Sequence, residues 1–223
     1  YIAHYASFML GAIFYYIFRL CHRYDLVFAT SPPLPVGLAG LFIAALKGSK
    51  FIIDIRDIWP DSAVVAGQLR KDSKLFKFGK IIEEWLYKKA DLITCVSRPM
   101  AKYIRGFAKN KPVEVIYNGV PTKYLHSETY TDKSLIELFQ NNKINITCLG
   151  NMGYVHNLQV VLEAAKQIKA EMPEVIFYLI GVGIEKKKLE KLKKDHDLHN
   201  VVITGPVLKE QAMQLMRDCS ALF

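Results

Sequence analysis

The sequence contains no cysteines or histidines at the spacing of a disulfide framework or a metal site. Cys21, Cys95, Cys148 and Cys219 are far apart, and three of them lie in or beside apolar, strand-like segments. We therefore expect reduced, buried thiols, as in a cytosolic protein. The histidines are scattered as well, without the spacing of a zinc site. The sequence predicts no metal ion and no other cofactor.

The sequence also lacks an apolar run long enough to cross a membrane. The run from Phe8 to Phe18 carries no charge but has only 11 residues, whereas a spanning helix needs roughly 20. We expect a buried helix here, with an interfacial or spanning helix as the alternative. No cleavable signal peptide is visible. Because the chain begins inside an apolar segment and ends in the strand-like residues 221–223, we expect neither end to be a natural domain edge.

Acidic residues are scarce in the first half of the chain. Residues 1–120 have a net charge of +8, whereas residues 121–223 have a net charge of +1. This excess predicts an anionic partner for the first half, such as a phosphorylated substrate or an acidic membrane. A nucleic-acid partner is not expected, because the basic excess lacks interleaved exposed aromatic residues and no nucleic-acid-binding motif is present.

Apolar segments of strand length alternate with helical segments through most of the chain. Such alternation is typical of parallel sheets covered by helices. The alternation stops over the polar residues 121–143, so we predict a linker there, between a domain of residues 1–120 and a domain of residues 144–223. The predicted fold class is α/β, with two incomplete Rossmann-like parallel-sheet domains. The expected strands are 25–30, 50–55, 91–96, 113–117, 144–149, 175–180 and 201–204, and the expected helices are 34–46, 73–89, one after Ser97, 158–169, 184–194 and 209–217.

Glycines follow two of the predicted strands of the second domain. Gly150, Asn151 and Gly153 lie between a strand and a helix, and Gly181 and Gly183 repeat that arrangement one unit later. Glycines let a backbone approach a ligand closely, and a helix N-terminus offers N–H groups to an anion, so a pyrophosphate would fit. Ligands of such folds bind beyond the strands' carboxyl ends, which here predicts a cleft between the domains. An ordinary strand-to-helix turn is the alternative.

Charged residues follow one strand of the first domain. Arg56 and Asp57 lie at its carboxyl end, where burying a charge is costly unless the group is used or paired. Arg56 could there bind phosphate or sugar hydroxyls. A structural Arg–Asp pair is the alternative.

The predicted helix 73–89 is amphipathic and basic. Lys74, Lys77 and Lys80 recur every three residues, and Lys71 lies just before them. A basic amphipathic helix can contact anionic lipid, so these four lysines are candidates to face a membrane. The alternative is an ordinary helix packed on its sheet with its lysines in solvent.

Six segments in a fixed order carry a family resemblance: DIRDIWPDS, ADLITCVS, VIYNGV, LGNMGYVHNLQVVLEAA, LIGVGIEKKKLEKL and NVVITGPV. They cover most of the chain, which resembles a retaining GT-B glycosyltransferase of sequence family 4. The form RDIWPDS is similar to the WbuB-like branch, which contains L-fucosamine transferases of bacterial surface-polysaccharide synthesis. The resemblance implies two Rossmann-like domains, a donor nucleotide held mainly by the second, and no metal requirement.

The resemblance also implies roles for residues of the second domain. Gly150 to Gly153 match the loop that faces the donor diphosphate. Pro206 and Val207 match the segment whose backbone contacts the nucleobase.

The chain departs from the commoner family pattern at several positions. Asn151 and His156 stand where the family usually has Arg and Lys, the cations that neutralise the diphosphate. Arg56 and Asp57 stand where the family usually has a His–Asp pair near the transferred sugar. The family's E-x7-E motif would lie beyond Phe223, and its glycine-rich acceptor loop would precede the chain.

We therefore expect a retaining glycosyltransferase that moves a sugar from a nucleotide diphosphate sugar, with UDP as the expected nucleotide. The expected acceptor is a lipid-linked glycan or a polysaccharide in bacterial surface-glycan synthesis. The positive first half predicts a cytoplasmic, peripheral enzyme at the inner face of the plasma membrane. The alternatives are a nucleotide-sugar 2-epimerase on the same fold and a non-catalytic membrane-binding remnant. We expect this chain to be inactive by itself.

Overall fold

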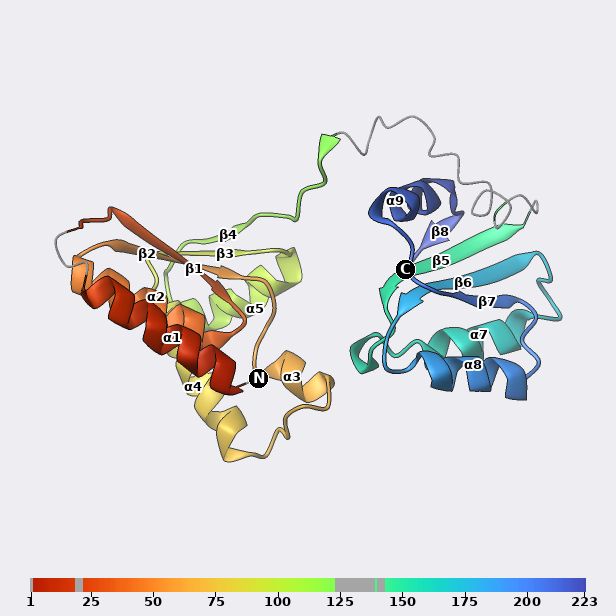
Figure 1. Ribbon diagram of the computed structural model, residues 1–223, viewed down its shortest axis with the longest axis horizontal. Coiled ribbons are helices and arrows are strands. Elements are labelled where there is room, and N and C mark those ends of the chain that lie inside the picture. The colour runs from red at the N-terminus through yellow and green to blue at the C-terminus, as the bar shows by residue number, and fades with distance from the viewer. Residues whose placement is uncertain (1, 19–21, 123–138, 140–142) are drawn as a thin grey trace. The chain divides into compact units, whose positions relative to one another are not determined.

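Figure 1 shows the computed structural model of the chain, which describes residues 2–18, 22–122, 139 and 143–223. The chain divides into two compact units, Tyr1–Gly119 and Val120–Phe223. The described part of each unit is built on a four-stranded sheet whose paired strands are parallel. Most of the predicted linker, residues 121–143, lies outside the described residues.

The first unit has its strands in the order β1-β2-β3-β4. Helices connect them, because parallel neighbours require a crossover. The elements in chain order are α1 (Ile2–Ile17), β1 (Leu26–Ser31), α2 (Leu34–Lys47), β2 (Lys50–Ile55), α3 (Asp61–Val65), α4 (Lys74–Lys89), β3 (Leu92–Cys95), α5 (Arg98–Ala108) and β4 (Val113–Val115).

Alternation of side chains along the strands places the core of this unit on one sheet face. Phe51, Ile53 and Ile55 of β2 are almost fully buried in one cluster with Leu86 of α4 and Ile104 of α5. Helices α2, α4 and α5 lie on this face (Figure 1).

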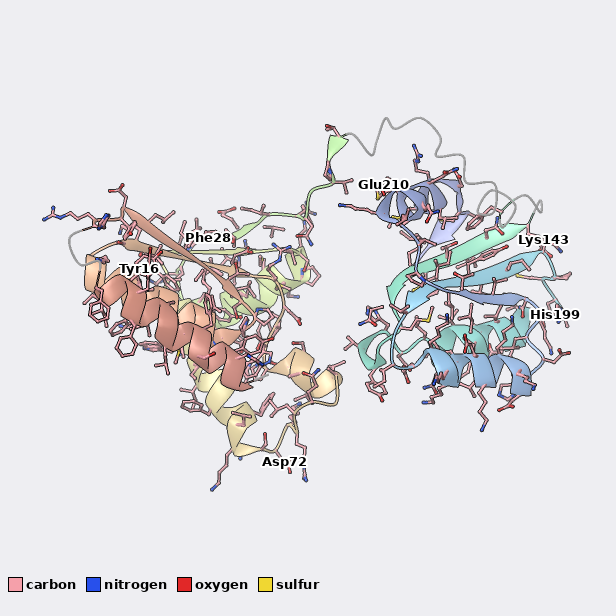
Figure 2. All side chains as sticks on the ribbon, in the orientation of Figure 1. Tyr16, Phe28, Asp72, Lys143, His199 and Glu210 are labelled. Atoms are coloured by element: carbon pink, nitrogen blue, oxygen red, sulfur yellow. The ribbon has the colours of Figure 1, made fainter. Side chains whose placement is uncertain are left out.

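The opposite sheet face carries both exposed and buried side chains. Phe28 of β1 is 58% exposed and lies on the side turned away from the helices (Figure 2). Asp54 of β2 and Thr94 of β3 are neighbours in register on the same face, and both are buried. This face therefore holds a polar pair near the carboxyl ends of its strands.

Helix α1 is not the buried helix that the sequence predicts. None of its described side chains is buried, and Phe8, Leu10, Phe14 and Tyr15 are each more than half exposed. The helix packs along α2, which covers only part of its apolar surface. Within the described residues, no helix is long and apolar enough to cross a membrane.

The second unit has its strands in the order β7-β6-β5-β8. Helices α7 and α8 lie on one sheet face and α9 on the other (Figure 1). The elements in chain order are β5 (Ile144–Asn151), η2 (Tyr154–His156), α7 (Gln159–Ile168), β6 (Val175–Val182), α8 (Lys186–Asp195), β7 (Val201–Thr204), α9 (Lys209–Asp218) and β8 (Ala221–Leu222).

Strand β6 is buried on both faces and so serves two cores. Phe177 belongs to the cluster of Leu189 on α8, whereas the next residue, Tyr178, belongs to the cluster of Leu215 on α9. A strand covered on both faces reads as a continuous apolar run, which is the pattern of residues 175–180.

The predicted fold class, two α/β domains with parallel sheets, is confirmed. Each predicted strand and helix is present, with bounds shifted by at most two residues. Ser97 caps α5 as predicted, because its Oγ accepts the N–H of Met100 at 3.4 Å. The short elements α3 and η2 were not predicted, since a single turn leaves no periodic pattern.

The described cysteines are free thiols that differ in burial. Cys95 is buried, whereas Cys148 and Cys219 are only half-buried; Cys21 lies outside the described residues. The expectation of buried thiols is therefore right for Cys95 and wrong for the other two. Burial raises the pKa of the Cys95 and Cys148 thiols above its ordinary value.

Candidate functional site

The candidate site of the second unit begins where β5 and β6 end side by side. Gly150 and Gly181 are partners in register, and both have a positive φ that L side chains rarely adopt. A Cβ at Gly181 would lie 1.9 Å from the carbonyl oxygen of Gly150, and a Cβ at Gly183 would lie 2.3 Å from that of Met152. The two glycine segments therefore pack backbone against backbone, which only glycine permits.

Met152 holds the two segments together. Its N–H donates to Val182 O at 2.7 Å, and its carbonyl accepts the N–H of Glu185 at 3.0 Å. Its side chain is 1% exposed and packs in the core under α7 and α8. These contacts fix the backbone of residues 150–153.

The outer side of the same segment is open. A Cβ at Gly150 would have no heavy atom within 4 Å, and a Cβ at Gly153 would meet only the Asn151 side chain, at 3.4 Å. Asn151 and His156 are exposed beside them. A ligand can thus approach the main chain from this side, while the inner glycines, Gly181 and Gly183, serve packing.

Helix α7 presents its N-terminus just beyond this loop. Leu158 occupies the N-cap position and provides no side-chain hydrogen bond, and the first turn holds no acidic residue. The positive end of the helix dipole and its first N–H groups therefore suit a negatively charged ligand.

Glu185, whose N–H bonds the carbonyl of Met152 in this loop, has a carboxylate with two partners. Glu185 is 5% exposed at the N-cap of α8. Its Oε1 accepts a hydrogen bond from Gln159 Nε2 at 3.3 Å and lies 3.6 Å from Lys188 Nζ.

The strand order marks the same edge. The chain runs from β5 through β6 to β7 and then returns to β8 on the other side of β5. In open α/β sheets, ligands bind outside the carboxyl ends of the strands, at the point where the order reverses. That point lies at β5, the strand that ends in Gly150 and Asn151.

Pro206 and Val207 follow β7 and so lie at this carboxyl edge as well. Pro206 is exposed, and Val207 packs against the cluster of Tyr178 and Leu215. One edge of the second unit therefore collects the predicted donor-binding residues Gly150, Asn151, Gly153, His156, Gly181, Gly183, Pro206 and Val207.

The first unit has side chains, rather than glycines, at its strand ends. Thr94 Oγ1 donates to Asp54 Oδ1 at 2.6 Å, and Arg56 Nη1 lies 3.4 Å from Asp54 Oδ2. Arg56 also donates to Asn118 Oδ1 through Nη2. An Arg–Asp pair is thus present, but Asp54 is the partner. Arg56 and Asp57 themselves are exposed.

The segment between Arg56 and Asp61 is packed on α4. A Cβ at Gly79 would lie 2.8 Å from the Trp59 ring and 3.2 Å from Pro60. At the end of the segment, Asp61 Oδ2 accepts a hydrogen bond from Lys80 Nζ at 3.0 Å. The RDIWPD sequence is therefore held at its aromatic centre and at its last carboxylate.

Lys80 lies in a network of ionisable side chains. Its ammonium bonds Glu83 and Tyr103 as well as Asp61, and Tyr87 donates to Glu83 Oε1 at 2.9 Å. Burial raises the pKa of Glu83, which its bonds to Lys80 and Tyr87 oppose. Burial lowers the pKa of Lys80, but its hydrogen bonds with Glu83, Tyr103 and Asp61 have the larger effect. The pKa of Lys80 is therefore raised above its ordinary value.

This network separates Lys80 from the other lysines of the predicted membrane-facing set. Lys71, Lys74 and Lys77 are exposed, whereas the Lys80 side chain is only 20% exposed. Because its charge is already neutralised inside the unit, we remove Lys80 from that set.

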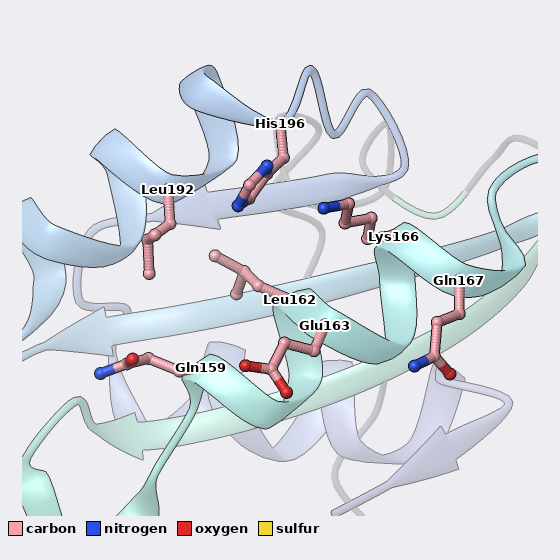
Figure 3. Close-up of a pocket in the computed structure, with 7 residues that line it drawn as sticks. All are labelled: Gln159, Leu162, Glu163, Lys166, Gln167, Leu192 and His196. Carbon is pink, nitrogen blue, oxygen red and sulfur yellow. The ribbon is translucent and has the colours of Figure 1, made fainter.

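A groove of about 550 Å³ lies between α7 and α8 (Figure 3). It contains none of the predicted site residues. Gln159 connects it to the glycine edge through the hydrogen bond to Glu185. The groove is lined by Gln159, Leu162, Glu163, Lys166, Gln167, Leu192 and His196.

The sequence did not predict the two residues that hold Asp54 and Arg56 in place, Thr94 and Asn118. Thr94 and Asn118 come from segments about 40 and 60 residues from Arg56, so no local pattern reveals them. A polar residue inside the apolar strand 92–95 was the available signal for Thr94. In the described part of the chain, no group of three or more His, Cys, Asp or Glu side chains could hold a metal ion.

The two parallel-sheet α/β units match the GT-B fold of glycosyltransferases. The structure is similar to that of HepE from Anabaena in complex with UDP-glucose, with a TM-score of 0.64 and 18% identity, over 89% of this chain and 52% of that chain. It is also similar to sucrose-phosphate synthase from Thermosynechococcus elongatus, with a TM-score of 0.68 and 16% identity, over 89% of this chain and 49% of that one.

The chain belongs to glycosyltransferase family 4, since the model described as Glycosyltransferase Family 4 matches residues 3–124. A second model, Glycosyl transferases group 1, matches residues 131–223.

Curated relatives are similar over much of this chain. An uncharacterised glycosyltransferase of Methanocaldococcus jannaschii is 24% identical over 66% of this chain and 38% of its own length. The probable glycosyltransferase WbjE of Pseudomonas aeruginosa is 25% identical over 72% of this chain and 40% of its own. The putative colanic acid biosynthesis glycosyl transferase WcaI of Escherichia coli is 23% identical over 89% of this chain and 50% of its own. The chain thus spans half or less of these relatives.

Proposed function

We propose that this chain is the part of a retaining glycosyltransferase that holds a nucleotide diphosphate sugar, with UDP as the nucleotide. The observation that carries the proposal is the glycine edge of the second unit. Gly181 and Gly183 bring two strand ends into backbone contact, and the open side of Gly150 and Gly153 faces outward. The HepE crystal structures, which share this fold, contain UDP-glucose or UDP.

The chemistry of the edge suits a diphosphate leaving group. Charge that develops on the phosphate can be stabilised by main-chain N–H groups and by the N-terminus of α7, which need no rearrangement during the reaction. Asn151 can add a neutral amide donor, and the ring of His156 can add an N–H donor. Pro206 and Val207, at the same edge, would contact the base.

Arg56 and Asp57 would orient the sugar or the acceptor. Arg56 is anchored by Asp54 and Asn118 and remains half exposed, so its guanidinium is held in place while a face stays accessible. A guanidinium fixed in this way can donate to sugar hydroxyls or phosphate.

The proposed acceptor is a lipid-linked or polysaccharide glycan of the bacterial surface, in the manner of the WbuB-like branch. The names of WbjE and WcaI, the latter assigned to colanic acid biosynthesis, support this acceptor class. The charge of +8 on residues 1–120 supports a peripheral location at the inner face of the membrane, with Lys71, Lys74 and Lys77 toward anionic lipid.

The donor site is tested with Gly153→Val in the full-length enzyme. Because only the Asn151 side chain lies near that Cβ, the variant should fold normally while its side chain blocks the approach to the loop. We expect calorimetry to show UDP binding to the wild type and at least about tenfold weaker binding to the variant. Gly106→Ala, which is open and lies in the first unit, serves as the control. Equal UDP affinity of Gly153→Val and wild type would refute the assignment.

A further inference from the structure

Helix α4 has an outward face whose large apolar side chains are only partly covered by the described residues of its own unit. Leu75, Phe78, Ile81 and Trp85 are 44%, 59%, 66% and 45% exposed. Their spacing of three to four residues places them along one stripe of the helix. The inward face is made by a different set, namely Phe76, Gly79, Glu83, Leu86 and Tyr87.

Lysines lie among these apolar side chains. At 100° per residue, Lys74, Lys77, Lys88 and Lys89 fall on the same half of the helix as the apolar stripe, and all four are exposed. Glu84, on the edge of this half, is paired with Lys88 at 3.2 Å. The outward face is therefore both apolar and positively charged.

We propose that this face of α4, from Lys74 to Lys89, inserts into the interfacial region of an anionic membrane. Phe78, Ile81 and Trp85 would enter the headgroup–acyl boundary, and Lys74, Lys77, Lys88 and Lys89 would bind lipid phosphates. The inference deepens the proposed membrane location and rests on that part of the proposed function, not on sugar transfer.

Charge complementarity identifies the occupant as anionic lipid. An apolar stripe alone would suit a second protein as well. Here the stripe is interleaved with four lysines, and among the described residues only Lys88 is paired with a carboxylate. Such a face matches the amphipathic helices that lie in a lipid interface. Tryptophan is enriched at that depth. The helix has 16 residues, and no described helix can span a membrane, so α4 would lie in the plane of the surface.

Helix α8 is the natural comparison within the chain. It carries more lysines than α4, including the exposed Lys187, Lys191 and Lys194. No large apolar side chain of α8 itself is among the exposed ones. If the lysines alone determined lipid binding, α8 would bind at least as well; if insertion matters, α4 dominates.

The test uses the full chain and vesicles of phosphatidylglycerol mixed with phosphatidylethanolamine. The triple variant Lys74→Gln, Lys77→Gln, Lys89→Gln should lower vesicle affinity about 100-fold, because each lysine near an anionic surface is worth about fivefold. The matched triple Lys187→Gln, Lys191→Gln, Lys194→Gln has the same net charge and should change affinity less than about threefold. Phe78→Ser should lower affinity about tenfold.

Trp85 reports insertion directly. Its emission should shift to the blue on binding, and the shift should be absent in Trp85→Phe, in which the half-buried Trp59 remains. Equal losses for the two lysine triples would overturn the proposal in favour of unspecific attraction. Absence of vesicle binding by the wild type, or burial of Trp85 in a dimer detected by sedimentation without lipid, would also overturn it. None of these readouts depends on UDP binding, which is measured separately.

Discussion

The two units present different kinds of surface at the carboxyl ends of their strands. In the second unit the edge is made of backbone, and Gly150, Gly181 and Gly183 allow two strand ends to touch. In the first unit the edge is made of side chains, where Asp54 and Arg56 are joined to groups from other segments. A backbone edge offers N–H groups without fixed charge, whereas a side-chain edge offers charge.

This difference determines how each edge should respond to substitution. The backbone edge fails when a side chain is added at Gly181 or Gly183, because the opposing main chain cannot move aside. A side-chain edge fails when one member of a hydrogen-bonded set is removed and its partner is left unpaired. The following predictions test this contrast, in decreasing order of the expected effect on stability.

The largest effect is expected from Gly183→Ala. The added methyl would lie 2.3–2.5 Å from backbone atoms of Met152, so we expect a loss of about 3 kcal/mol or more in the free energy of unfolding. Denaturant unfolding followed by circular dichroism measures it. Gly153→Ala, in the neighbouring segment but open, should change stability by less than about 0.5 kcal/mol. Similar values for the two variants would contradict the backbone-edge interpretation.

The next largest effect is expected from Lys80→Met, which removes the cation that bonds Asp61 and Glu83 in the first unit. Glu83 would be left buried without its charge partner, at a cost of about 3 kcal/mol near neutral pH. Burial raises the pKa of Glu83, and loss of Lys80 would raise it further. A carboxyl whose pKa is raised by folding favours the folded state at low pH, and this contribution is lost as the pH rises through the folded pKa.

The destabilisation by Lys80→Met should therefore be larger at about pH 8 than at about pH 5, where Glu83 can be protonated. Urea unfolding at both pH values checks this. Lys77→Met, on the exposed side of the same helix, is the control and should show little change at either pH. A pH-independent loss in Lys80→Met would argue against Glu83 as the cause.

A smaller effect is expected from Thr94→Val. The substitution keeps the shape but removes the hydroxyl that donates to Asp54 Oδ1 at 2.6 Å, which should cost about 1–3 kcal/mol. Thr94→Ser retains the donor and should be closer to wild type. If valine and serine variants unfold at the same denaturant concentration, the hydrogen bond is not what stabilises this edge.

The smallest effect on stability is expected from Arg56→Lys. The side chain is 50% exposed, so stability should change by about 0.5 kcal/mol or less. Lysine, however, lacks the planar guanidinium and could not reproduce the proposed contact to the sugar. We therefore expect kcat/KM of the full-length enzyme to fall about 100-fold. An unchanged kcat/KM would assign Arg56 to structure alone.

Much of the fold could be predicted because its signals are local. Continuous apolar strands such as 175–180 and serine caps such as Ser97 lie within a few residues of what they determine. The glycines at 150, 153, 181 and 183 could likewise be assigned to a strand edge from spacing alone. Their division into packing and open positions could not, because it depends on which strand lies opposite.

The sequence by itself determined two parallel α/β units and the residues that follow their strands at each carboxyl edge. Only the tertiary structure decided which charges are available. Lys74, Lys77 and Lys80 look equivalent at a spacing of three, yet Lys80 is bound to Asp61 and Glu83 while the others are exposed. Arg56 likewise pairs with Asp54, not with its neighbour Asp57. The reason is physical: periodicity places a side chain on a helix or strand, but its partners come from distant segments that only folding brings into contact.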